Sequence, residues 1–210
     1  MSKSKAGTTP EQQSARTKNG ARWETLLEEA HKFYRRNRTA DLIRLPVPFM
    51  QVGTVPLLKH RGKAICIRSK RSTVDFMGCI RDGHARQVLV EAKSTTNKGK
   101  WQLGKLQPHQ AAALFRCARY GGIAGVALYS SSMGDAYWLP AEPAGAAAEV
   151  IPRDWLALVC DELRSLTGET VPGVKFADLE AAGLLIPRTS GIHDWLHVAL
   201  EQDEQTGGSR

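Results

Sequence analysis

The stretch that constrains this chain most is residues 72–93, STVDFMGCIRDGHARQVLVEAK. Its two β-rich apolar runs flank an Asp-Gly pair, and that combination is a strong short-range signal for a β-hairpin. Because side chains two apart on a strand share a face, Glu91 and Lys93 are expected to point the same way. If the two strands pair, Asp75 can lie beside them. Two carboxylates and an ammonium at a sheet edge suit a divalent cation and an activated water, which is the chemistry of metal-dependent phosphodiester cleavage.

The composition is that of a basic globular protein. The length of 210 residues and the apolar content of 42% fit one domain with appendages. The formal net charge of +8 predicts a polyanionic partner, although charge alone does not say what is done to that partner. The four cysteines are scattered singly, which argues against a zinc site and fits reduced, packed thiols.

Neither a membrane span nor a secretory signal is recognisable in the sequence. No apolar run approaches the length of a bilayer span. The N-terminal residues have no apolar region after their lysines, as a secretory signal would. We therefore expect a cytoplasmic, nucleoid-associated protein with no membrane partner.

The chain is expected to divide into a core and two tails. Residues 1–18 are polar, basic and without periodicity, which predicts a disordered basic tail. Such a tail is either a phosphate-contacting arm or a solubilising segment, and composition does not separate the two. Residues 19–200 are expected to form a single domain, followed by a flexible C-terminal tail at 201–210.

Hydrophobic patterning predicts an α/β domain. The strand at Ile123–Ser130 is apolar throughout, so it is expected to be central and covered on both faces. Glu24 lies off the apolar stripe of the first helix, and from the sequence alone a solvated residue is the better interpretation. The expected elements around the hairpin are a helix over Arg22–Asn37, strands over Thr39–Leu45, Ile123–Ser130 and Ala136–Leu139, an alanine-rich linker over Glu142–Glu149, helices over Trp155–Leu166 and Phe176–Ala182, and a final apolar segment over Trp195–Leu200.

A projecting basic hairpin is predicted immediately before the first acid. From about Phe49 to Arg71, two apolar stretches flank a cluster of cations and Gly62, which indicates an ordered stalk with a basic tip. Cations at this density suit a duplex backbone, because each neutralised phosphate releases counterions. A solvated loop is the alternative. The candidate DNA-binding side chains of this segment are Lys59, His60, Arg61, Lys63, Arg68, Lys70 and Arg71.

A polar loop and a helix follow the hairpin. Thr95, Lys98 and Lys100 belong to a cationic segment just past the acids, where they can position a phosphate backbone. Pro108 suits the first turn of a helix that runs to about Tyr120. Gln110 lies in that first turn and can reach the sheet edge, so it is either a site residue or a helix-end polar group.

The serial order of these motifs resembles the RecU family of Holliday junction resolvases. The resemblance covers about Asn19 to Leu139 and, more weakly, Phe176 to Leu200. It implies the PD-(D/E)XK nuclease superfamily, with a restriction-endonuclease-like core in which helices flank a mixed central sheet. The motifs that carry it are Trp23-Glu24, Pro46-x-Pro48, Ser72-Thr73-Val74-Asp75-Phe76-x-Gly78, Glu91-Ala92-Lys93-x-Thr95, Leu106 to Gln110 and Gly121-Gly122-Ile123.

The resemblance assigns roles to individual positions. Asp75 and Glu91 match the metal-binding acids, with the carbonyl of Ala92 as a further ligand. Lys93 matches the lysine that orients the attacking water and helps to neutralise the phosphate. The remaining matches are Glu24 to the acid of the first helix, which raises it above a solvated residue, Gln110 to the glutamine after the core strands, and Thr95 to the threonine beside the active-site strand. Val74 stands where the superfamily has proline, which is a backbone preference and not a ligand.

The implied activity is that of a crossover junction endodeoxyribonuclease in DNA recombination and repair. The expected cofactor is Mg²⁺, with Mn²⁺ substituting, and the expected partners are a four-way DNA junction and a second copy of the chain in a symmetric dimer. Two alternatives remain. One is a nuclease of the same fold that acts on other branched or duplex DNA. The other is a non-catalytic DNA-binding recombination accessory protein, against which the intact acids and lysine argue.

Overall fold

A computed structural model of the protein describes residues 10–46, 49–54, 64–68, 74–81, 85–159 and 172–206. At its centre is a five-stranded sheet with the strand order β1-β4-β5-β7-β8. Only β5 and β7 run parallel, and the other neighbours are antiparallel, so the sheet is mixed as expected. The strands of this sheet are β1 (Ala40–Arg44), β4 (Phe76–Ile80), β5 (Gln87–Thr95), β7 (Ile123–Ser130) and β8 (Asp135–Pro140).

The predicted hairpin is confirmed as the antiparallel pair of β4 and β5. Phe76 is opposite Val90 in this pair, and Gly78 is opposite Val88. A Cβ on Gly78 would lie 1.9 Å from the carbonyl oxygen of Asp41, so the neighbouring strand β1 approaches too closely for any other residue. The turn residues 82–84 lie outside the described residues.

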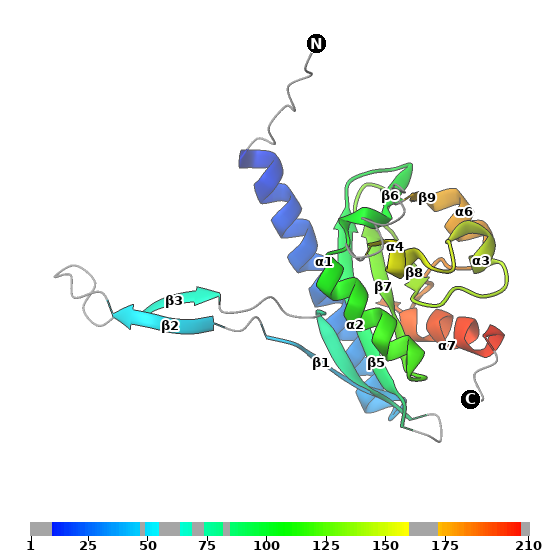
Figure 1. Ribbon diagram of the computed structural model, residues 1–210, viewed down its shortest axis with the longest axis horizontal. Helices are drawn as coiled ribbons and strands as arrows, with labels where there is room; N and C mark the ends of the chain where they lie inside the picture. Colours follow the sequence, from blue (N-terminus) through cyan, green and yellow to red (C-terminus); the bar gives the residue numbers. More distant parts are fainter. Residues whose placement is uncertain are drawn as a thin grey trace, which may run out of the picture.

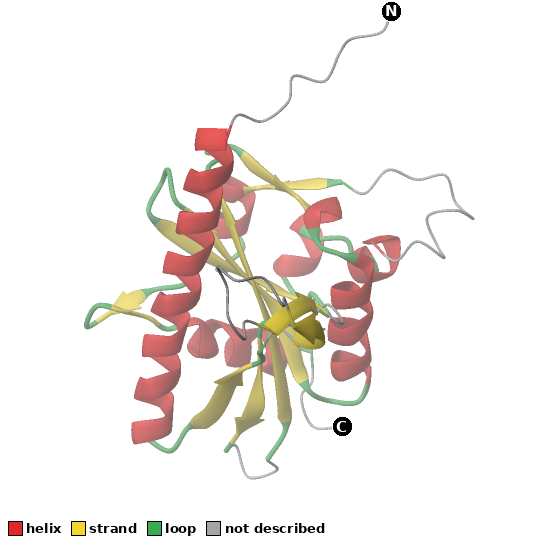
Figure 2. Cartoon of the chain, turned by 90° about the vertical axis from the view of Figure 1, so that its left-hand side faces the viewer, coloured by secondary structure: helices red, strands yellow, loops and turns green. Residues whose placement is uncertain are grey.

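Two long helices cover the sheet. Figures 1 and 2 show the sheet between α1 (Pro10–Arg36) and α2 (Pro108–Arg119). Trp23 of α1 is fully buried, and its indole N–H donates to the carbonyl oxygen of Ala127 at 2.8 Å. Every residue of β7 is buried, which confirms the prediction of a central strand covered on both faces. This covering holds the ends of β4 and β5 in one fixed arrangement.

The first helix is longer than predicted. α1 begins at Pro10, so the prediction of a tail without structure is wrong for 10–18, while residues 1–9 lie outside the described part. Helix formation is cooperative, and residues of good helix propensity extend a helix that its apolar stripe already anchors. Proline at the first position suits such a start, because its missing N–H would have no partner there.

Two predictions in the C-terminal third need correction, and a third is confirmed in part. The last helix, α7 (Trp195–Gln205), continues past residue 200, because Gln202 is 4% exposed and Asp203 pairs with Arg86 at 2.6 Å. The predicted linker contains the short helix α3 (Ala147–Val150), whose Ala147 is buried. α4 (Trp155–Val159) confirms the start of the next helix, and residues 160–171 lie outside the described residues. Tertiary contacts stabilise these segments, and local patterning does not reveal such contacts.

The stalk is present as two paired strands. β2 (Phe49–Thr54) and β3 (Ala64–Arg68) form an antiparallel pair with an irregularity between Gln51 and Gly53, and Figure 1 shows the pair extending away from the sheet. Arg68 belongs to β3, of which only the backbone is described. The other six predicted stalk side chains, Lys59, His60, Arg61, Lys63, Lys70 and Arg71, lie outside the described residues.

Several short elements complete the chain. None of the described helices is both long and apolar enough to cross a membrane. The helix predicted near Phe176 is confirmed as α6 (Phe176–Ala181). Two short pairs of strands were not predicted. The short elements are β6 (Lys100–Gln102), paired with β9 (Gly173–Lys175), the 3-10 turn η1 (Leu103–Lys105), α6, and β10 (Arg188–Thr189), paired with β11 (Ile192–His193).

Candidate active site

Three predicted site residues meet in one hydrogen-bonded cluster. Lys93 Nζ lies 2.5 Å from Glu91 Oε1, which confirms that the two side chains share a face of β5. Gln110 Nε2, from the first turn of α2, donates to the same Glu91 oxygen at 2.5 Å. Lys93 Nζ also donates to Gln110 Oε1 at 3.2 Å. Residues from a strand and from the helix start therefore hold one another in a closed triangle.

Asp75 joins this cluster from the start of β4. Its Oδ2 accepts a hydrogen bond from the backbone N–H of Ala92 at 2.9 Å. The backbone carbonyl oxygen of Asp75 accepts from the N–H of Leu45 at 2.8 Å, which anchors the residue to the end of β1. In a strand, the N–H and the C=O of one residue point to the same side. The Ala92 carbonyl therefore faces the side on which the Asp75 carboxylate lies.

Glu91 is a buried acid with an unsatisfied oxygen. The residue is 1% exposed, and its Oε2 has no hydrogen-bond partner. Burial raises the pKa of Glu91 to about 8; the neighbouring Lys93 ammonium lowers this pKa and the Asp75 carboxyl raises it. A buried carboxylate oxygen without a donor carries a large desolvation cost. The cost is offset if a cation binds there.

Gln110 caps α2 and also contacts the two charged side chains of β5. Its Oε1 accepts from the backbone N–H of Gln107 at 3.1 Å as part of a reciprocal capping box at the start of α2. The same oxygen accepts from Lys93, and the amide nitrogen donates to Glu91. The helix cap thereby fixes the side chain that orients the lysine and the acid.

Glu24 lies beside the cluster, and an arginine that was not predicted holds it there. The side chain of Glu24 is 23% exposed and pairs with Arg44, which also contacts Glu28 at 3.1 Å. Burial raises the pKa of Glu24, the Arg44 guanidinium lowers it, and the nearby Asp75 carboxylate raises it. Glu24 is therefore partly buried and paired, and not a fully solvated residue. In the sequence, the only signal for Arg44 was its position as a cation directly before Leu45-Pro46, where the predicted strand ends.

The predicted DNA-contacting loop is ordered by its own hydrogen bonds. Thr95 is 9% exposed, and its hydroxyl accepts from the backbone N–H of Asn97 at 3.1 Å. Lys98 and Lys100 are exposed. Two residues that were not predicted lie beside Thr95, because Ser131 donates to the Thr95 carbonyl oxygen and accepts from Asn19. No sequence motif marked this contact between α1 and the end of β7.

The donor set fits a cation that prefers oxygen ligands. Within the described residues, no group of three or more His, Cys, Asp or Glu side chains could hold a metal ion. The available donors are the Asp75 and Glu91 carboxylates and the Ala92 carbonyl. The unpartnered Glu91 Oε2 supports this arrangement, since a bound cation would supply the missing partner. Two carboxylates that leave room for waters and substrate oxygens suit Mg²⁺.

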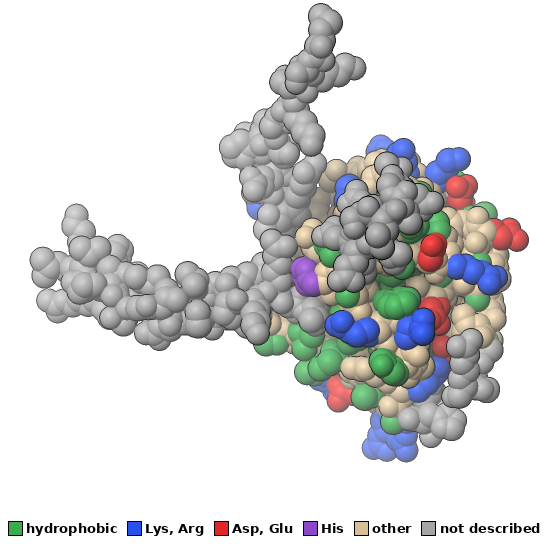
Figure 3. Space-filling view, viewed as in Figure 1, with side chains coloured by type: hydrophobic (Ala, Val, Ile, Leu, Met, Phe, Trp, Pro, Cys, Tyr) green, Lys and Arg blue, Asp and Glu red, His purple; other side chains and the backbone are tan. Residues whose placement is uncertain are grey.

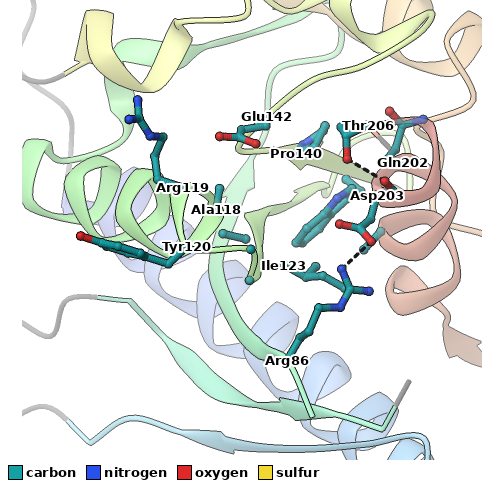
Figure 4. A pocket seen from close by; sticks show the side chains of 15 residues that line it. Arg86, Ala118, Arg119, Tyr120, Ile123, Pro140, Glu142, Gln202, Asp203 and Thr206 are labelled. Carbon is teal, nitrogen blue, oxygen red and sulfur yellow. Dashed lines mark hydrogen bonds and ion pairs between the residues drawn. The ribbon is translucent and has the colours of Figure 1, made fainter. Parts of the chain in front are cut away.

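A separate cavity lies at the other end of α2. It has a volume of about 240 Å³ and none of the predicted site residues lines it. Figure 4 shows the Arg86–Asp203 ion pair and Gln202 on one side of this cavity, and Arg119 and Tyr120 on the other. The chemistry suggested by the sequence therefore does not reside in this cavity.

Comparison with known proteins gives a family match. A family model described as RecU, recombination protein U, matches residues 18–149. Holliday junction resolvase RecU of Streptococcus gordonii is 28% identical over 123 residues, which are 58% of this chain and 60% of that protein. The Geobacillus sp. protein of the same name is 28% identical over 124 residues, or 58% and 60%. The chain thus spans about 60% of the length of these relatives.

A third relative matches a longer part of the chain, and one solved structure is similar at lower sequence identity. Holliday junction resolvase RecU of Staphylococcus saprophyticus is 27% identical over 145 residues, which are 66% of this chain and 67% of that protein. Among solved structures, the Holliday junction resolvase Hjc of Archaeoglobus fulgidus is similar with a TM-score of 0.42 and 13% identity, covering 86% of this chain and 99% of that one.

Proposed function

Because the chain belongs to the RecU family of recombination proteins, we propose that it is a metal-dependent endodeoxyribonuclease that resolves Holliday junctions. The observation that carries the proposal is the cluster of Asp75, Glu91, Lys93 and Gln110. A DNA-binding accessory protein has no need of a buried acid with an unsatisfied oxygen at this position. Resolution would proceed by paired symmetric nicks during DNA recombination and repair.

The cofactor proposed for this site is Mg²⁺, with Mn²⁺ as a substitute. Asp75, Glu91 and the carbonyl of Ala92 would hold it. When bound, a divalent cation supplies Lewis acidity, which activates water and offsets the negative charge that develops on the phosphate. The two carboxylates by themselves would repel a phosphodiester, so the cation is also what permits the DNA backbone to approach.

Lys93 is proposed to stabilise the negative charge that develops on the phosphate during cleavage. An ammonium has three N–H donors, and two of those of Lys93 are directed at Glu91 and Gln110. The third can reach a phosphate oxygen or orient the attacking water. Since the donor is held by two partners before substrate arrives, little reorganisation is needed during the reaction. Gln110 is a positioning residue in this scheme, because it acts through Lys93 and Glu91.

The substrate proposal is a four-way junction cut by a homodimer. A junction has two-fold symmetry and requires two matched nicks. An isologous dimer presents two identical sites related by the same symmetry. Two copies of the chain would therefore place one cluster at each of two opposed strands.

A comparison of DNA substrates tests this function. The full-length protein is incubated with four-way, flap and linear DNA, with and without Mg²⁺, and the products are resolved on denaturing gels. We expect symmetric nicks in two opposed strands of the four-way junction, only with metal. Equal cutting of flap or linear DNA would identify a nuclease of broader substrate range. Binding without any cutting in Mg²⁺ or Mn²⁺ would identify a non-catalytic protein.

The predicted stalk gives a second test. Replacing Lys59, Arg61 and Lys63 together by Gln should weaken junction binding and lower the slope of log affinity against log salt concentration. Each lost phosphate contact lowers the magnitude of this slope by about 0.9. Binding is measured by fluorescence anisotropy over a salt series in EDTA.

The matched control for the stalk removes the same number of charges elsewhere. Lys32, Arg36 and Arg81 are exposed. Lys32 and Arg36 belong to the C-terminal part of α1, just before β1, and Arg81 follows β4, whereas Asp75 precedes β4 at its opposite end. Their replacement by Gln should leave the salt slope close to that of the wild type. If the stalk variant keeps the wild-type slope, the stalk does not contact phosphates.

A further inference from the structure

The two-stranded ribbon of β6 and β9 places Lys100 and Lys175 side by side, and neither forms an ion pair with a described acid. We propose that this ribbon, through Lys100 and Lys175, is a second contact surface for the phosphate backbone of a junction arm. The inference rests on the proposed junction-binding function and adds to it a DNA contact from the C-terminal part of the chain.

The strand register sets Lys100 directly opposite Lys175. The two strands are antiparallel, with Trp101 opposite Val174 and Gln102 opposite Gly173. Trp101 is 1% exposed and Val174 is 3% exposed, so this pair faces the core. Because side chains alternate along a strand, the two lysines stand together on the outer face. Both are exposed.

Like charges directly opposite each other destabilise a strand pair. Lys175 is unfavourable for a second reason, because it occupies the N-cap position of α6 and has no side-chain oxygen to cap that helix. The partial positive charge of a helix N-terminus also disfavours a cation there. These placements make the ribbon less stable in the free protein, and a polyanion that binds both ammonium groups would relieve the repulsion.

No carboxylate neutralises these lysines within the part of the chain that the structure describes. Five other cations there are in ion pairs: Lys32 with Glu29, Arg35 with Asp41, Arg44 with Glu24, Arg86 with Asp203 and Lys93 with Glu91. No described acid lies within 4.0 Å of the ammonium of Lys98, Lys100 or Lys175. Exposed cations such as Arg36 and Arg81 also lack an ion pair with a described acid, and Lys100 and Lys175 differ from them in lying directly opposite each other. Figure 3 shows Lys and Arg side chains at the top edge of the molecule, with acidic side chains beside some of them.

The ribbon is rigidly joined to the catalytic strand. Asn97 accepts from the N–H of Gly99 at 3.0 Å, and its own N–H donates to Thr95 at the end of β5. The N–H of Phe176 donates to the Gly99 carbonyl oxygen at 3.1 Å, so β9 is attached to the same loop. The backbone of the ribbon is therefore ordered before DNA binds, which lowers the entropic cost of binding.

The ribbon also lies within reach of the substrate. Lys100 is seven positions after Lys93 in the sequence, a span of at most about 25 Å in a fully extended chain. That distance is about seven base-pair steps of B-DNA, at about 3.4 Å each along one strand. Lys100 and Lys175 can therefore contact the arm that Lys93 is expected to cut. β9 lies beyond residues 18–149, so the family match does not include Lys175.

The test compares salt slopes of junction binding for full-length proteins in EDTA. Replacing Lys100 and Lys175 together by Gln should lower the slope by about 1.8, since two phosphate contacts are lost. Affinity at 0.1 M salt should fall by about ten- to sixtyfold. The unfolding temperature of the free variant should be equal to or higher than that of the wild type, because the repulsion is removed. The corresponding double replacement by Arg should restore the slope.

The control replaces Lys32 and Arg36 by Gln, which removes the same charge at the far end of α1. An unchanged slope in the ribbon variant, or an equal fall in the control, overturns the inference. Failure of the proposed function is a different outcome, in which the wild type neither binds nor cuts the junction. If the wild type cuts while the ribbon variant keeps its slope, only the ribbon inference fails.

Discussion

If the proposed function holds, Asp75→Asn is expected to reduce cleavage of a four-way junction by about 10³-fold or more, because one of the two proposed carboxylate ligands is lost. Binding of the junction should stay within about twofold, since Asp75 is not among the proposed phosphate contacts. The fold should be retained as well. The amide oxygen of Asn can still accept the hydrogen bond from the N–H of Ala92, which measures 2.9 Å to the carboxylate.

The measurement is a single-turnover cleavage rate in Mg²⁺, beside an anisotropy titration in EDTA. The matched control is Asp41→Asn on the neighbouring strand β1. Asp41 is exposed and pairs with Arg35 at 2.7 Å, away from the cluster, so its loss should leave the rate near that of the wild type. A wild-type rate in Asp75→Asn would show that the site has been assigned wrongly.

Glu91→Gln is expected to abolish cleavage and yet stabilise the metal-free protein at pH 8. Gln has nearly the same shape and removes the charge from a side chain that is 1% exposed. The ionised form of Glu91 lacks a partner for Oε2, which makes that form costly in the absence of a cation. The amide no longer supplies a charged ligand, so the stabilising effect of added Mg²⁺ should disappear along with the activity.

The protonation of Glu91 makes the free energy of unfolding fall as the pH rises. Because burial raises the pKa of Glu91 to about 8 in the folded protein, from its ordinary value of 4.5, the folded state holds this proton more tightly than the unfolded state. The stabilising contribution is fully present below pH 4.5 and is lost as the pH rises through 8. Between these values the free energy of unfolding should fall by at most about 1.4 kcal/mol per pH unit.

Unfolding temperatures of the metal-free protein between pH 7 and 9 isolate this effect. Burial also lowers the pKa of His31 to about 4 and raises the pKa of Cys117 to about 11, so the contributions of these two groups change below pH 6.5 and above pH 9. The wild type should lose about 3–5 °C per pH unit up to pH 8, and Glu91→Gln should lose much less. Equal slopes in both proteins would contradict a buried, proton-binding Glu91. Adding Mg²⁺ at pH 8 should raise the unfolding temperature of the wild type alone.

Local signals in the sequence account for the centre of the site. The Asp-Gly pair and the β-rich runs around it predict an antiparallel pair, and that pairing brings Asp75 beside Ala92. The two-residue period of a strand is enough to place Glu91 and Lys93 on one face. Pro108 marks the start of α2, which places Gln110 in reach of both. Each inference depends on neighbours along the chain, whose geometry is limited by backbone sterics.

Long-range contacts decided the rest. Arg44 meets Glu24 only because β1 and α1 are packed together, and the charge of Glu24 is thereby held near Asp75. The pairing of Lys100 with Lys175 joins segments far apart in the chain, and no local pattern predicts that register. The sequence alone determined which acids, lysine and glutamine can act together, because strand period and helix start are local properties. Only the tertiary structure decided how Glu91 is buried and which cations are left without counterions, since desolvation and charge pairing depend on the packing of the whole domain.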